Sequence, residues 1–250
     1  MTAHAARTGV WFIGARGSVA TTATAGCAAV AAGLHPPTGM VTETPPFHGA
    51  GLPPLTSLVF GGHDTLDCPL PKRAEALAAG GVLPHGLPSA VRSELTAADE
   101  EIRSGGPLPG DTRTDEELVA SFAAHIQDFT RRHGLARTVV INVASTEPAP
   151  GEDDSRLPAS SLYAAAALRA GCPYANFTPS TGLRSPQLRE AVDSCGLPHA
   201  GRDGKTGQTL LRSVLAPMFV QRALPVRAWS GTNLLGGGSS ITAPLDGHQR

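Results

Sequence analysis

A short glycine turn near the amino terminus has the residue types that bind a phosphate-containing cofactor. Gly14-Ala15-Arg16-Gly17-Ser18-Val19 follows an apolar strand and leads into a helix of small side chains. Glycines let a pyrophosphate approach the backbone, and free N–H groups at a helix N-terminus favour its negative charge. The G-x-G-x-x-G pattern is incomplete, because Arg16 and Val19 occupy two of its glycine positions. The context predicts a dinucleotide turn, in which Arg16 either contacts a phosphate or remains a solvated loop residue.

Polar side chains follow three further predicted strands. They are Asp64, the pair Ser145 and Thr146, and the segment 176–180. Open α/β sheets bind ligands in the crevice beyond the carboxyl ends of their strands, so we expect these side chains to line one cofactor cleft. An acid that binds a ribose hydroxyl is expected about 20 residues after such a turn. Glu43 is the candidate by order, with an ordinary loop residue as the alternative.

Lys205 is a second candidate for chemistry. It opens a predicted helix within the segment 201–209, and Lys72 is the only other lysine in the chain. A lysine is unfavourable at a helix N-terminus, where the dipole attracts anions. One interpretation is a tolerated surface lysine. In the other, Lys205 binds a substrate phosphate or acts as an acid or base, while Asp203 orients it or contacts nucleotide. The glycine spacing excludes a Walker A loop.

The elements that must position these residues alternate between strands and helices. Strands are expected at 10–13, 40–42, 57–60, 138–143, 174–177, 198–200 and 226–230, and helices at 18–32, 89–103, 114–132, 158–170 and 206–222. The helix from Thr114 has the clearest signals, because Thr114 and Glu117 form a capping box ahead of one apolar face. This order predicts an α/β fold with a doubly wound, Rossmann-like parallel sheet.

Composition excludes several classes of function. A formal net charge of −1 and a pI near 6.7 give no broad attraction for nucleic acid. No apolar run approaches the roughly 18 residues of a membrane span. The four cysteines form no CxxC pair and have no histidine at metal spacing, so we expect reduced thiols and no metal site. We therefore expect neither a nucleic-acid nor a membrane partner.

Four segments, in this order, resemble the myo-inositol-phosphate synthase (inositol-3-phosphate synthase) family. They are Gly14-Ala15-Arg16-Gly17-Ser18, Leu58-Val59-Phe60-Gly61-Gly62-His63-Asp64, Asn142-Val143-Ala144-Ser145-Thr146-Glu147, and the stretch 201–216. The last is the most specific, because Asp203-Gly204-Lys205-Thr206-Gly207-Gln208-Thr209 runs into an arginine-serine-valine-leucine helix. The resemblance covers nearly the whole chain, from residue 9 to residue 238.

The resemblance implies a cytoplasmic enzyme of inositol and phospholipid biosynthesis that converts glucose 6-phosphate into 1L-myo-inositol 1-phosphate with tightly held NAD. In such a reaction the C5 hydroxyl is oxidised, the ketone enolises, the ring closes by an aldol step, and the product is reduced without net redox change. By position, Lys205 and Asp203 would be catalytic. The residues that would contact NAD are Gly14, Ala15, Arg16, Gly17, Ser18, Val19, Asp64, Ser145, Thr146, Thr206 and Asn233.

The resemblance also implies two domains and a homotetramer. Residues 1–200 would form the NAD-binding Rossmann-like domain, and 201–250 would start a mixed α+β domain for catalysis and oligomerisation. The family's N-x-L-G-x-x-D-G pattern lacks its acid here, since Ser239 and Ser240 follow Gly238, and the chain then ends at Arg250. A C-terminal truncation by a frameshift or early stop would explain both departures.

We therefore expect weaker NAD binding than in a full-length relative and little cyclase turnover. One alternative is a catalytically inactive remnant that binds NAD or a sugar phosphate. Another is an unrelated NAD-linked dehydrogenase, which would accumulate NADH.

Overall fold

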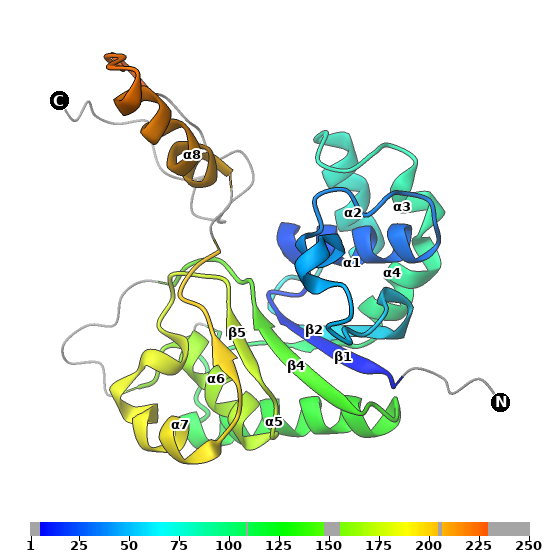
Figure 1. The fold of residues 1–250 in the computed structure, drawn as a ribbon. Coiled ribbons are helices and arrows are strands. Elements are labelled where there is room, and N and C mark those ends of the chain that lie inside the picture. Colours follow the sequence, from blue (N-terminus) through cyan, green and yellow to red (C-terminus); the bar gives the residue numbers. More distant parts are fainter. Residues whose placement is uncertain (1–5, 109, 148–155, 205–206, 230–250) are drawn as a thin grey trace.

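The chain folds around a six-stranded parallel sheet with helices on both faces (Figure 1). The structure, a computed structural model, describes residues 6–108, 110–147, 156–204 and 207–229. The strands are β1 (Thr8–Ile13), β2 (Leu58–Asp64), β3 (Ile102–Ser104), β4 (Arg137–Asn142), β5 (Tyr174–Asn176) and β6 (His199–Ala200). Their order, β3-β2-β1-β4-β5-β6, is that of doubly wound sheets that bind dinucleotides, and it reverses direction between β1 and β4. The predicted fold class is confirmed.

The helices form two layers. One layer contains α1 (Ser18–Ala31), α2 (Leu70–Ala79), α3 (Leu87–Ala90) and α4 (Arg92–Asp99); the other contains α5 (Asp115–Arg132), α6 (Ala159–Arg169) and α7 (Arg189–Cys195). The last helix, α8 (Gly207–Gln221), lies apart from both layers (Figure 1). Several of its apolar side chains, among them Leu211 and Val214, are more than half exposed.

Alternation along β1 divides the core between the two layers. Trp11 and Ile13 belong to the cluster that packs on α5 and α6, whereas Val10 and Phe12 belong to the cluster on α1, α2 and α4. All residues of β1 are buried, as expected of a central parallel strand covered on both faces. Alanines on the buried side of α1 leave room for the helix to lie close to the sheet.

Helix α5 confirms the clearest helix prediction. The Thr114 side chain accepts the N–H of Glu117 at 3.2 Å, and the Glu117 carboxylate accepts the N–H of Thr114 at 2.7 Å. The predicted apolar face is buried against the sheet, through Leu118, Phe122, Ile126 and Phe129. Local capping and packing therefore favour the same helix boundaries.

Three predicted elements are wrong. The segment 40–42 is no strand, because Val41–Glu43 forms an exposed 3₁₀ turn beside the prolines at 45 and 46. The predicted helix at 89–103 ends earlier, since Ile102 instead pairs with Gly62 and adds β3 to the sheet edge. The predicted strand at 226–230 is absent over 226–229, where no strand of the described part of the chain pairs with it, and residue 230 lies outside the described residues.

No helix in the described part of the chain is long and apolar enough to cross a membrane.

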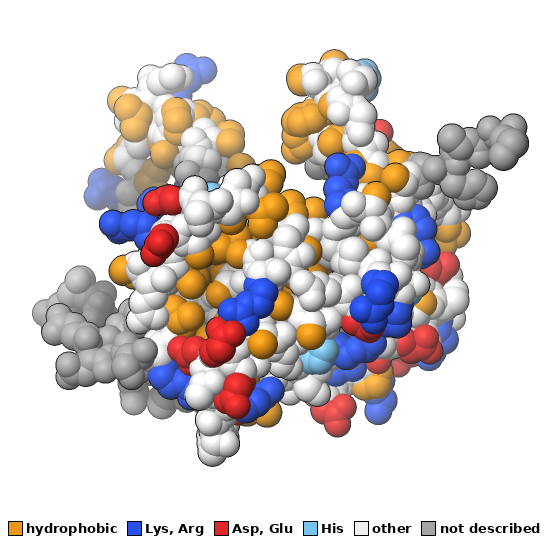
Figure 2. All heavy atoms as spheres, turned by 90° about the horizontal axis from the view of Figure 1, so that it is seen from below, with side chains coloured by type: hydrophobic (Ala, Val, Ile, Leu, Met, Phe, Trp, Pro, Cys, Tyr) orange, Lys and Arg blue, Asp and Glu red, His pale blue; other side chains and the backbone are white. Residues whose placement is uncertain are grey.

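Seen from below, acidic and basic side chains lie beside one another on the described surface (Figure 2). Ion pairs such as that of Arg169 with Glu116, 2.7 Å apart, bring opposite charges together. The interspersed charges cancel over short distances, so this face generates no broad field.

Replacing Thr114 with Ala removes one side of the capping box. We expect the free energy of unfolding to fall by about 1 kcal/mol, because the N–H of Glu117 loses its acceptor. Urea unfolding of the variant and of Thr38→Ala, an exposed loop threonine, measures the effect. Equal stability of the two variants would show that the box contributes nothing.

Candidate functional site

The glycine turn (residues 14–19) lies at the point where the strand order reverses. Gly14 has a φ of +81°, and a Cβ placed there would be 2.7 Å from the Cα of Ala144. The N–H of Val143 donates to the carbonyl of Ile13 at 3.0 Å. Only glycine therefore fits at position 14, and the turn after β1 touches the loop after β4 across the crevice where such sheets bind ligands.

The end of β2 holds the first half of the glycine turn. The His63 carbonyl accepts the N–H groups of Gly14 at 2.9 Å and Ala15 at 3.1 Å. The N–H of Arg16 donates to Oδ2 of Asp64 at 2.6 Å. Two consecutive residues of β2 thus satisfy three consecutive donors of the turn, and these donors are not free for a ligand.

The second half of the turn is open. The N–H of Gly17 donates to the Gly14 carbonyl, and the N–H of Thr21 donates to the Gly17 carbonyl. The first-turn N–H groups between them, those of Ser18, Val19 and Ala20, precede the first intrahelical bond. No side chain caps this end of α1, and its first turn contains no acidic residue. These donors can therefore receive an anion.

A cation from α2 lies beside this open end. Arg73 donates from Nε to the Arg16 carbonyl at 3.1 Å and from a terminal nitrogen to Oγ of Ser18 at 3.3 Å. None of the ion pairs among the described residues involves Arg73. Both of its acceptors are neutral, so its positive charge is available to a ligand at the turn.

Arg16, the arginine that the sequence indicates for a phosphate, has a different set of contacts. Its Nε is 3.0 Å from Oδ1 of Asp99, and another nitrogen donates to the Leu66 carbonyl at 2.8 Å. The Arg16 side chain thus ties the turn to α4 and to the loop after β2. Sequence analysis missed Arg73, because only the packing of α2 against α1 brings it to the turn.

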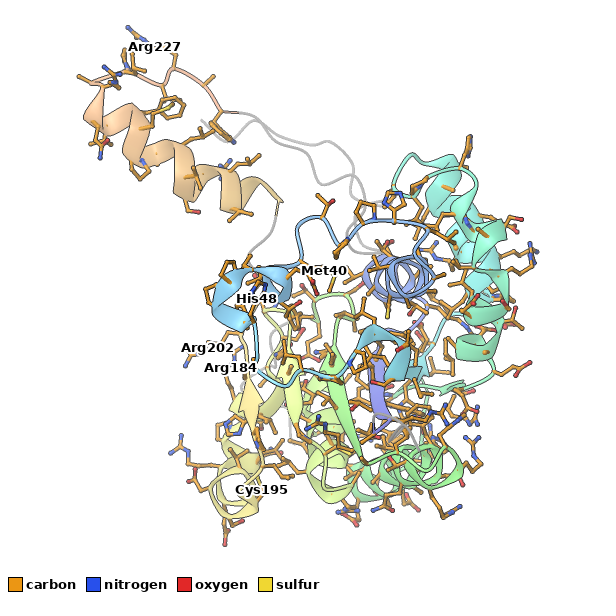
Figure 3. All side chains as sticks on the ribbon, turned by 45° about the vertical axis from the view of Figure 1, so that its right-hand side comes forward. Met40, His48, Arg184, Cys195, Arg202 and Arg227 are labelled. Atoms are coloured by element: carbon orange, nitrogen blue, oxygen red, sulfur yellow. The ribbon has the colours of Figure 1, made fainter. Side chains whose placement is uncertain are left out.

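Asp64, rather than Glu43, is the acid next to the glycine turn. Each carboxylate oxygen of Asp64 accepts one backbone N–H, from Arg16 and from Leu66, which leaves lone pairs for further donors. Glu43 lies on an exposed 3₁₀ turn, and the element before this turn is helix α1 rather than a strand. In Figure 3 the labelled Met40 and His48, which come before and after Glu43 in the sequence, lie towards the same edge of the sheet as Arg202, and Cys195 lies at the other end.

The ends of β4 and β5 form a polar floor beside the turn. Asn142 donates to Oδ1 of Asn176 at 3.2 Å and to Oγ1 of Thr178 at 3.3 Å, and all three side chains are buried. Ser145 and Thr146 follow this floor and are exposed. The structure thus places the two predicted cofactor residues in the loop that touches the glycine turn.

Asp203 lies where the chain leaves β6. The N–H of Gly204 donates to Oδ1 of Asp203 at 2.8 Å and to the Phe177 carbonyl at 3.3 Å. Gly201 has a φ of +95° and its α-carbon faces the backbone of Asn176 too closely for any side chain. Asp203 is therefore exposed near the end of β5. The predicted site residues Lys205, Thr206 and Asn233 lie outside the described residues.

A buried histidine supports the end of β2. Trp11 donates from Nε1 to Nδ1 of His63 at 3.0 Å, and Nε2 of His63 is 3.0 Å from Nδ1 of His125. Burial, then the nearby His125 and Arg103, lowers the pKa of His63 to about 3. His63 is therefore neutral at neutral pH. The sequence gives a weak signal for it, a histidine within an otherwise apolar strand.

The chain is similar to known proteins of one family. A family model described as myo-inositol-1-phosphate synthase matches residues 8–245. Inositol-3-phosphate synthase 1 of Bacteroides thetaiotaomicron is 31% identical over 92% of this chain and 62% of its own length. The human protein of that name is 28% identical over 75% of this chain and 38% of its own length. The chain thus spans less than two thirds of these relatives.

A solved structure shares the fold. Inositol-3-phosphate synthase from Caenorhabditis elegans aligns with a TM-score of 0.70 at 19% identity, over 88% of this chain and 53% of that protein.

Replacing Gly14 with Ala tests the contact across the crevice. The positive φ and the approach of Ala144 should lower the free energy of unfolding by about 1–3 kcal/mol. Gly26→Ala, inside α1 with open space around its α-carbon, should instead raise it by about 0.5–1 kcal/mol. Urea unfolding of both variants checks the opposite signs; a stable Gly14→Ala protein would contradict this geometry.

The low pKa of His63 makes stability depend on pH. The unfolded chain binds a proton at His63 below about pH 6.5, and the folded chain does not until about pH 3, so stability falls as pH drops through this window. For His63 alone, going from about pH 7 to about pH 5 should cost ~2 kcal/mol. His125, whose pKa burial also lowers, adds to the same slope.

Urea unfolding at the two pH values measures this dependence. The loss of unfolding free energy between the two pH values should be smaller by ~2 kcal/mol in His63→Asn, because the unfolded chain then binds one proton fewer. It should stay unchanged in His35→Asn, which alters an exposed histidine. Equal losses in both variants would show that His63 titrates normally.

Proposed function

Because the chain belongs to the myo-inositol-1-phosphate synthase family, we propose that it binds NAD at the glycine turn and takes part in converting glucose 6-phosphate into 1L-myo-inositol 1-phosphate. The observation that carries this proposal is the open half of the turn. There the guanidinium of Arg73 donates to Oγ of Ser18, beside the uncapped N–H groups of Ser18, Val19 and Ala20. This donor set suits a pyrophosphate.

The acid at the end of β2 favours NAD over NADP. An aspartate in this position of a dinucleotide fold accepts hydrogen bonds from ribose hydroxyls. Asp64 is held by the N–H groups of Arg16 and Leu66 beside the turn, so its remaining lone pairs can meet a ribose there. A 2′-phosphate at the same place would be repelled by the carboxylate.

The remaining site residues are assigned to the nicotinamide and substrate end. Bound NAD supplies a reversible hydride acceptor for the sugar carbon. We assign Ser145 and Thr146, exposed on the loop that touches the turn, to contacts with the dinucleotide, and Thr206 and Asn233 to its distal part. Lys205 would bind the substrate phosphate or move a proton at the reacting carbon, with Asp203 orienting it.

Domain organisation and assembly extend the proposal. Residues 1–200 would act as the dinucleotide-binding domain, which agrees with a sheet that ends at β6. Residues 201–250 would begin the catalytic and oligomerisation domain of a cytoplasmic homotetramer. The exposed apolar side chains of α8 support association with further polypeptide.

Titration with NAD and NADP tests the proposed function. We expect saturable NAD binding, detected by calorimetry, and weaker NADP binding. Asp64→Ser should weaken NAD binding by about tenfold, the effect of roughly one lost charge-assisted hydrogen bond. It should also reduce the difference between the affinities for NAD and NADP. Arg73→Gln should weaken NAD but not adenosine, whereas Lys72→Gln, which removes the same charge from an exposed position of α2, should change neither.

The outcomes separate the possibilities. An absence of saturable NAD binding by the unaltered chain would refute the proposal. Incubation with glucose 6-phosphate and NAD then tests for chemistry: inositol phosphate without net NADH supports the family's reaction, and NADH accumulation would indicate a dehydrogenase instead.

A further inference from the structure

Three side chains form a hydrogen-bond chain whose direction follows from their chemistry. The indole Nε1–H of Trp11 can only donate, so Nδ1 of His63 accepts. A neutral His63 then has its proton on Nε2 and donates it to Nδ1 of His125. His125 must in turn be unprotonated at Nδ1. The chain Trp11→His63→His125 therefore exists only while both imidazoles are neutral.

The imidazole of His63 is held in place by its ring neighbours and by contacts at both nitrogens. It is fully buried, with its centroid 4.9 Å from Trp11, 4.8 Å from Phe122 and 5.4 Å from Tyr163. Both ring nitrogens are engaged, one inside the sheet and one towards α5. If His125 ceases to accept, the Nε2–H of His63 becomes a buried donor without a partner, and that penalty favours a shift of the ring.

A shift of His63 would move the glycine turn. The His63 carbonyl holds Gly14 and Ala15, and the next residue, Asp64, holds Arg16. On the opposite face of β2, a Cβ at Gly62 would lie 2.6 Å from the Cβ of Ala15, so strand and turn are in close contact there. The acceptors of the turn therefore move with the peptide that carries the His63 ring.

Tyr163 connects the same strand end to the loop after β3. Its hydroxyl accepts the N–H of Gly106 at 2.8 Å, and the N–H of Gly105 donates to the Asp64 carbonyl at 2.7 Å. His63 and Asp64 are thus held from β1, α5, α6 and this loop. Among these supports, the one through His125 rests on an imidazole, the side chain whose unperturbed pKa lies nearest to neutral pH.

We propose that His125 is a positioning residue for the dinucleotide site: as acceptor at the end of the chain from Trp11, it holds the β2 end and the glycine turn in the form that binds NAD. The inference rests on the proposed function. His125 touches no cofactor in this role and acts through His63.

Protonation of His125 should release the turn, because a protonated ring has no acceptor at Nδ1. The charged and titratable groups that face His125 are Arg103 from β3, Arg113 from the loop before α5, and Asp128 from its own helix; His63 lies on the inner side. Burial, then Arg103, lowers the pKa of His125, and Asp128 opposes this shift. NAD affinity should therefore fall as pH drops below the ordinary range of histidine.

Two substitutions separate the acceptor from the bulk of the side chain. His125→Asn keeps an oxygen acceptor near the position of Nδ1, and His125→Leu removes it. We expect His125→Leu to weaken NAD binding by about tenfold, comparable to one unsatisfied buried donor, and His125→Asn to remain within about twofold of the unaltered chain. NAD affinity of the unaltered chain should decline as pH drops below the ordinary range of histidine, and that of His125→Asn should stay flat over the same interval.

Hydrogen exchange gives a readout without cofactor. In His125→Leu the amides of Gly14 and Ala15 should exchange faster, while that of Val140 in β4 should not change. His35→Leu, at an exposed site, is the matched control. The proposal is overturned if His125→Leu leaves both NAD affinity and Gly14 exchange unchanged, or if His125→Asn behaves as His125→Leu does. If the unaltered chain binds no NAD, the proposed function fails, and the exchange measurement still decides whether His125 holds the turn.

Discussion

Two consecutive residues at the end of β2 accept the first backbone donors of the glycine turn, and the geometry of the crevice depends on these bonds. His63 and Asp64 can do this only because β1 and β2 pair in a register that sets Ile13 opposite His63. A slip of this register would leave the donors of the turn without partners. Such donors are costly to bury, so the pairing of two strands also determines the shape of the turn.

The glycine turn has one half that the protein holds in place and one half that is open to a ligand. The N–H groups of its first half are bonded to β2, while those that open α1 have no acceptor among the residues that the structure describes. The two arginines nearby divide in the same way. Arg16 is neutralised by Asp99 and ties the turn to α4, whereas Arg73 keeps its charge beside Ser18. An anion at this point completes the hydrogen bonding of a helix end that the chain itself leaves open, which is why a pyrophosphate suits it.

Local signals predicted the parts of this site that depend on local structure. The capping box of α5, the β-branched strand β4 and the strand-turn-helix order around the glycine turn were predicted correctly, because each is specified by neighbouring residues. The roles of Arg73 and His63 were not predicted, because they come from contacts between segments about 50 residues apart. The error at 40–42 has the opposite cause, because β propensity without a partner strand does not make a strand. The resemblance indicated the site residues, and their roles remain predictions.

The division of the turn into a supported half and an open half is the central claim, and amide NMR during a titration with NAD tests it most directly. The claim predicts saturable shifts of the Ser18, Val19 and Ala20 amides, with smaller shifts at Gly14 and Ala15, whose N–H groups already have partners. Saturable shifts confined to other parts of the chain, or equally large shifts at Gly14 and Ala15, would contradict it.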